Sequence, residues 1–96
     1  MPKFLPVRRD IAVVVDADLP AQAVVDAVNA AKISLVQQIQ LFDIYQGKGI
    51  AENKKSLAFH VLMQDTHKTL LDIEAETAMA ELLKLLENQF GATLRN

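Results

Sequence analysis

The stretch of residues 41–59, LFDIYQGKGIAENKKSLAF, constrains the fold of this chain more than any other. It contains two segments in which apolar and polar residues alternate, joined by residues 46–53, which include two glycines. Alternation with a period of two is typical of a strand with one buried face. A glycine-containing connection between two such segments indicates a β-hairpin. The remaining elements therefore have to pack around this hairpin.

The rest of the chain supplies further strands and two helices. Four segments read as strands: residues 7–15, 35–45, 55–64 and 92–95. Apolar residues at helical spacing predict an amphipathic helix at about residues 20–32 and a longer one that begins near Asp72 and stops at Gly91. The order β-α-β-β-α-β predicts an α+β fold, the ferredoxin-like sandwich, in which two helices cover one face of a four-stranded antiparallel sheet. Its length of 96 residues is that of one domain.

Strand parity divides the predicted sheet into two faces. The predicted core face carries Ile11, Val13, Val15, Phe42, Ile44, Leu57, Phe59, Val61 and Met63. The other face, here called the open face, carries Arg8, Asp10, Ala12, Asp43, Tyr45, Ser56, Ala58 and His60. The parity of residues 35–45 is not uniform, because Ile39 and Leu41 share the face of Asp43. Either a β-bulge shifts the phase near Gln40, or this strand is apolar on both faces.

Composition narrows the possible functions. The formal net charge of −2 argues mildly against a non-specific nucleic-acid binder, although basic residues cluster near the N-terminus and the hairpin turn. No apolar run approaches the length of about 18 residues that a membrane span needs, so we expect no membrane contact. The absence of cysteine excludes disulfides and thiolate zinc sites and agrees with a cytoplasmic location.

Three kinds of chemical site are not supported by the residue pattern. The sequence GKG at residues 47–49 joins two strands, whereas a phosphate-binding loop joins a strand to a helix. His60 and His67 lack the further ligands that zinc requires. Asp72, Glu74 and Glu76 read as charges at a helix start rather than as paired catalytic carboxylates. We therefore expect no catalytic residue, no metal and no cofactor in this domain.

The open face has a different chemistry. Tyr45 offers a stacking plane, Asp43 an acceptor for base N–H groups, Ser56 a hydroxyl, and Ala12 a small floor under a flat base. Positive charge near this face comes from Arg8, Arg9, Lys54, Lys55 and Arg95. Proteins read single-stranded RNA by stacking splayed bases on aromatic rings and hydrogen-bonding the base edges. The alternative is a face that is merely solvated or that forms a dimer.

Several segments together resemble a known family: FLPVRRDIAVVVD, LFDIYQGKGIAENKKSLAFHVLMQ, KTLLD and FGATLR. In this order and spacing they are similar to the ferredoxin-fold anticodon-binding domain that ends the β subunit of bacterial phenylalanyl-tRNA synthetase. The resemblance covers nearly the whole chain. It implies a domain excised from the C-terminus of a longer subunit, with residues 1–96 as a single unit.

The resemblance also implies a partner and a set of contacts. The family's domain grips the anticodon stem-loop of phenylalanine tRNA, and its sheet face reads the first anticodon base. The matching positions are Tyr45 for stacking, Asp43 and Ser56 for the polar edge of the base, Ala12 beneath it, and Arg95 as a basic contact. Arg8, Arg9, Lys54 and Lys55 are further expected contacts to the RNA backbone.

The rest of the enzyme would lie outside this chain. The resemblance implies that the other β-subunit domains and the α subunit complete a heterotetrameric ligase, whose ATP and magnesium sites are elsewhere. One departure from the family pattern is Leu71, where a threonine often caps the last helix; Asp72 or Thr69 would then act as the cap. The alternative function is a small-ligand-binding or dimerisation domain on the same scaffold.

Overall fold

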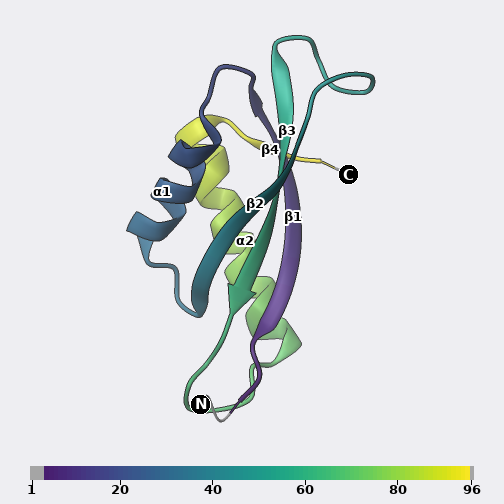
Figure 1. Ribbon diagram of the computed structural model, residues 1–96. Coiled ribbons are helices and arrows are strands. Elements are labelled where there is room, and N and C mark those ends of the chain that lie inside the picture. Colours follow the sequence, from purple (N-terminus) through teal and green to yellow (C-terminus); the bar gives the residue numbers. More distant parts are fainter. Residues whose placement is uncertain (1–3, 96) are drawn as a thin grey trace.

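The computed structural model describes residues 4–95, and within them the predicted order of elements is confirmed (Figure 1). The strands are β1 (Val7–Asp16), β2 (Val36–Tyr45), β3 (Lys54–Met63) and β4 (Thr93–Leu94). The helices are α1 (Ala21–Ala31) and α2 (Asp72–Phe90). No helix in this described part of the chain is both long and apolar enough to cross a membrane.

The four strands form one sheet in the order β2-β3-β1-β4. All neighbouring strands are antiparallel, and β3 pairs along its whole length with β1, from Lys54 opposite Asp16 to Met63 opposite Val7. Both helices lie on one side of the sheet, as Figure 1 shows. This is the ferredoxin-like α+β sandwich that the order of elements predicted.

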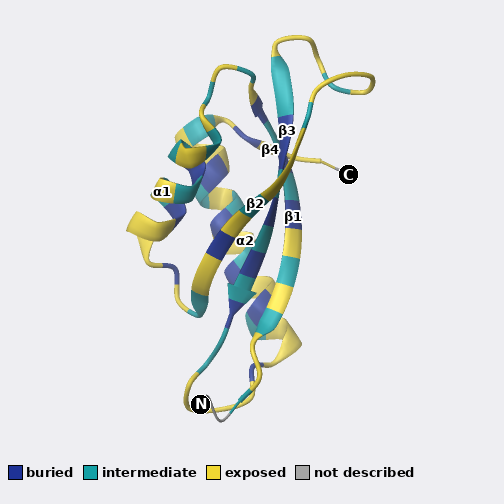
Figure 2. Cartoon of the chain, in the orientation of Figure 1, coloured by how far each residue is buried: buried dark blue, intermediate teal, exposed yellow. Residues whose placement is uncertain are grey.

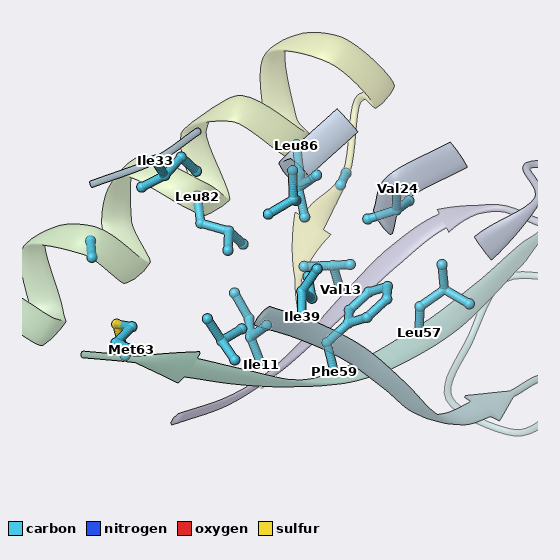
Figure 3. Close-up of a cluster of buried hydrophobic side chains, with 14 of the residues drawn as sticks. Ile11, Val13, Val24, Ile33, Ile39, Leu57, Phe59, Met63, Leu82 and Leu86 are labelled. Atoms are coloured by element: carbon cyan, nitrogen blue, oxygen red, sulfur yellow. The ribbon is translucent and has the colours of Figure 1, made fainter. Parts of the chain in front are cut away.

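The core lies between the helices and the sheet. Burial is strongest in the second half of β1 and along β3 from Ser56 to Met63, where buried residues alternate with more exposed ones (Figure 2). Leu82 and Leu86 of α2 and Val24 of α1 pack towards this face (Figure 3). Seven of the predicted core residues are buried: Ile11, Val13, Val15, Leu57, Phe59, Val61 and Met63.

The prediction was wrong for Phe42, and a β-bulge is the reason. Leu41 pairs with Phe59, yet Asp43 pairs with the next residue of β3, Ala58, so Phe42 is an extra residue without a partner of its own. The bulge puts Ile39 and Leu41 on the core face and turns Phe42 to the open face, where it is 47% exposed. The predicted phase shift is therefore confirmed, two residues beyond Gln40.

Ile44 is also not in the core, for a different reason. It pairs with Leu57 and so has the parity of the helix-covered face, but it is 51% exposed. Figure 2 shows the hairpin projecting beyond the helical layer, and the outer strand is exposed there. The side chain of Ile44 therefore projects to the predicted face of the sheet but is not buried there.

The start of α2 is stabilised by Glu74 rather than by Asp72 or Thr69. Leu71 occupies the N-cap position, and its backbone N–H donates to Glu74 Oε1 at 2.9 Å. Glu74 Oε2 accepts from Lys68 Nζ at 2.8 Å. The hydrogen bond from Lys68, with a second from the Leu71 amide, lowers the pKa of Glu74 below its ordinary value. At the other end, Gly91 adopts a φ of 66° and closes the helix as predicted.

We expect Leu57→Ala to lower the free energy of unfolding by about 2–5 kcal/mol, because Leu57 is fully buried. Ile44→Ala is a matched control, since Ile44 is the cross-strand partner of Leu57 but is half exposed. It should cost about 1 kcal/mol or less. Urea denaturation of both variants measures the difference, and equal losses would contradict the assigned burial.

We also expect Glu74→Gln to destabilise the chain at neutral pH and to make little difference in acid. A carboxyl whose pKa is lowered by folding stabilises the folded state above its ordinary pKa, and this stabilisation is lost as the pH falls through the lowered value. Thermal unfolding between pH 3 and 7 tests this, with Glu81→Gln on the same helix as the control. A gap between parent and variant that stays constant with pH would rule out a role of the charge.

Candidate nucleic-acid interface

The open face brings together the residues that were predicted to contact a base. Tyr45 of β2 lies opposite Ser56 of β3, and Asp43 lies opposite Ala58, which in turn lies opposite Ala12 of β1. Directly opposed residues in an antiparallel sheet project to the same side. Tyr45, Ser56, Asp43 and Ala12 therefore form one cluster on the side away from the helices.

The hairpin loop fixes the position of the Tyr45 side chain. Its hydroxyl donates to the carbonyl oxygen of Lys48 at 2.9 Å. Gly47 has a φ of 147°, and a Cβ there would lie 3.2 Å from Tyr45 Oη, so a side chain at residue 47 would crowd the ring. Because the hydroxyl is bonded within the loop, the ring is the part of Tyr45 available to a ligand.

Arg95 reaches Tyr45 across the sheet. Its backbone N–H donates to the carbonyl oxygen of Ala12 at 2.9 Å, which continues the pairing of β4 with β1. Its guanidinium carbon lies 4.8 Å from the centroid of the Tyr45 ring, within the range of a cation–π contact. Strands β2 and β4 are the outermost strands, about 14 Å apart at the usual strand spacing. The two side chains therefore meet above β3 and β1.

Ser56 of β3 is the cross-strand neighbour of Tyr45. It is on the predicted face, between Tyr45 and Val14 of the neighbouring strands, but only 2% of its surface is exposed. The expected hydroxyl is thus in the right place and covered. A ligand that touches Ser56 therefore requires the side chains around it to move.

The other predicted basic contacts do not join this cluster. Arg9 and Lys55 have the parity of Ile11 and Leu57, so they project to the helix side, and Arg9 pairs with Asp72 of α2 at 3.5 Å. Successive strand residues face opposite sides, so these two residues are not on the open face itself, and their expected contact with the RNA backbone stays a prediction.

Two other basic residues, Arg8 and Lys54, do project to the open face, but each is paired with an acidic residue away from the cluster. Arg8 lies opposite Leu62, about 20 Å along the sheet from Ser56 at the usual rise per residue, and its Nε is 3.6 Å from Asp10. Lys54 Nζ is 2.6 Å from Asp16 Oδ1 at the opposite end of the face. Arg95 is therefore the predicted cation that contacts the aromatic ring.

An aromatic stack that the sequence did not predict lies next to this cluster. The rings of Phe42 and His60 are stacked, with centroids 3.8 Å apart and planes at 7°. His60 Nδ1 is 2.7 Å from Asp10 Oδ1. The phase slip in residues 35–45 was the available signal, because a bulge there changes the face of one residue.

Among residues 4–95, His60 and His67 are not part of any group of three or more side chains that could hold a metal ion.

Comparison with known proteins identifies the class of this domain. The sequence matches the ferredoxin-fold anticodon binding domain family over residues 2–95. The chain therefore belongs to that family, as the resemblance in its motifs implied.

Its relatives include a particular subunit from several bacteria. The chain is 52% identical over 94 residues to the phenylalanine–tRNA ligase beta subunit of Nitrosospira multiformis, covering 98% of this chain. It is 52% identical over 93 residues to the same subunit of Dechloromonas aromatica and 42% identical over 94 residues to that of Dehalococcoides mccartyi. The chain spans 11–12% of the length of these relatives.

The contact between Arg95 and Tyr45 can be tested by fluorescence, because Tyr45 is the single tyrosine and the chain has no tryptophan. We expect Arg95→Ala to make Tyr45 emission more sensitive to quenching by acrylamide. Arg8→Ala removes the same charge from the far end of the same face and should leave quenching unchanged. Equal quenching of the parent and Arg95→Ala would contradict a stable contact.

Proposed function

We propose that this chain is the C-terminal anticodon-binding domain of a phenylalanine–tRNA ligase β subunit, and that its open face binds the anticodon loop of phenylalanine tRNA. Membership of the anticodon-binding family and the names of the relatives support this proposal. The observation that carries it is the cluster of Ala12, Asp43, Tyr45, Ser56 and Arg95 on one face.

Each member of the cluster has a role that its chemistry allows. A base stacks on the Tyr45 ring, whose plane the loop holds in place. The exposed carboxylate of Asp43 accepts hydrogen bonds from base N–H groups, and Ala12 leaves room for a flat ring. Arg95 leaves its position against Tyr45 when the base arrives and pairs with the RNA. The side chains around the buried Ser56 also move, so that its hydroxyl reaches the base. The free-energy cost of moving Arg95 away from Tyr45 is small, because a base stack replaces the lost cation–π contact.

Catalysis would belong to the assembled enzyme. In this proposal the remaining β-subunit domains and the α subunit form a cytoplasmic heterotetramer that attaches phenylalanine to tRNA with ATP and magnesium. The domain adds a contact far from the reacting atoms, and its binding energy combines with that of the other tRNA contacts. A small-ligand or dimerisation function is less favoured, because the distinctive residues gather on the sheet face and carry groups suited to a base.

We expect Tyr45→Ala to weaken binding to the phenylalanine tRNA anticodon stem-loop by about 1–3 kcal/mol, the loss of one base stack. Tyr45→Phe is the control, since it keeps the ring and removes only the hydroxyl that bonds to Lys48. Fluorescence anisotropy with a labelled stem-loop measures the affinities. Equal binding by the parent and Tyr45→Ala would remove the stacking role.

A further inference from the structure

A second aromatic surface lies on the open face, next to the cluster around Tyr45. Phe42 is the extra residue of the bulge in β2 and is 47% exposed, on the same face as His60. His60 is four residues from Ser56 along β3, which corresponds to about 13 Å. The bulge therefore displays a large apolar ring at a position where regular alternation would have pointed it towards the helices.

One face of the Phe42 ring packs against the side chain of His60. It lies parallel to the imidazole of His60 at 3.8 Å, and His60 is held by Asp10 at 2.7 Å. Asp10 in turn lies 3.6 Å from Arg8 Nε. The arrangement spans β2, β3 and β1, so three strands fix the orientation of the exposed ring before any ligand arrives. A ring that is ordered in advance costs little entropy on binding.

The surroundings of this stack are polar. A shallow hollow of about 130 Å³ beside it is lined by Arg8, Gln38, Gln40, His60 and Leu62. Amide side chains and a guanidinium can hydrogen-bond base edges and phosphate oxygens. An apolar helix of a partner protein would instead need an extended apolar groove. An exposed aromatic ring next to polar side chains is suited to a ligand that is flat and has polar edges, as a nucleobase is.

We propose that Phe42 and His60 form a second stacking platform, which takes an unpaired base of the same RNA loop whose other base lies on Tyr45. This inference rests on the proposed function, because it assumes that the anticodon loop lies along the open face. Splayed bases of a single-stranded loop stack on successive aromatic groups of a binding surface. The face of Phe42 that points away from His60 receives the base, and the hollow on the His60 side of the stack receives polar groups of a neighbouring nucleotide.

The test compares the affinity of the anticodon stem-loop for three variants. Phe42→Leu keeps an apolar side chain but removes the ring, and binding should weaken about fivefold or more. Phe42→Trp keeps a stacking plane and should bind about as well as the parent. Ile44→Ala is the matched control, because Ile44 is similarly exposed on the opposite face of the same strand, and its affinity should not change.

The outcomes separate this inference from the proposed function. If Tyr45→Ala weakens binding and Phe42→Leu does not, the second platform is overturned while the anticodon-binding function stands. The exposed Phe42 surface would then be a candidate contact with protein instead of RNA. If the parent does not bind the stem-loop at all, both proposals fail. Intermolecular nuclear Overhauser effects from Phe42 ring protons to base protons give a second test in the unmodified chain. Their absence in a complex that shows such effects from Tyr45 would also overturn the platform.

Discussion

The bulge at Phe42 is the constraint on which the rest of the structure depends. Side chains of a strand alternate strictly between faces, so β2 cannot bury Ile39 and Leu41 and also display Asp43 and Tyr45 unless one extra residue resets the phase. The first half of β2 thereby completes the core beneath the helices. The second half extends past the helical layer (Figure 1). Its register with β3 puts Asp43 and Tyr45 on the open face.

One face of the sheet therefore packs against the helices and stabilises the fold, and the other is the proposed binding surface. The close packing of Leu57 and Phe59 makes β3 a rigid central strand, and the alternate residues of that strand, Ser56 and His60, are held at fixed spacing on the open face. At rest the face is partly closed, because Arg95 lies over the Tyr45 ring and Ser56 is buried. Binding would then begin at the exposed groups and proceed to the buried hydroxyl once the side chains around it have moved.

Sequence periodicity predicted the order of elements, the two helices and seven buried strand residues because those features are local. It placed Phe42 wrongly because a bulge is set by the register between two strands, and the phase slip gave its presence but not its position. Arg9 was expected near the open face, but strand alternation directs its side chain to the other face, where it pairs with Asp72. The contact of Arg95 with Tyr45 joins residues fifty positions apart, and no local pattern contains it. Strand parity and the family resemblance independently indicated Ala12, Asp43, Tyr45 and Ser56, and the observed register explains why these residues share a face.

The most direct test is a titration of the ¹⁵N-labelled chain with the phenylalanine tRNA anticodon stem-loop, followed by NMR. Binding on the open face predicts that the amides of Ala12, Asp43, Tyr45 and Ser56 and the side-chain Nε–H of Arg95 shift together with one saturation curve. The solvent-facing sides of α1 and α2 should not respond. Shifts confined to the helices, or no shift at saturating RNA, would contradict a binding site on the open face.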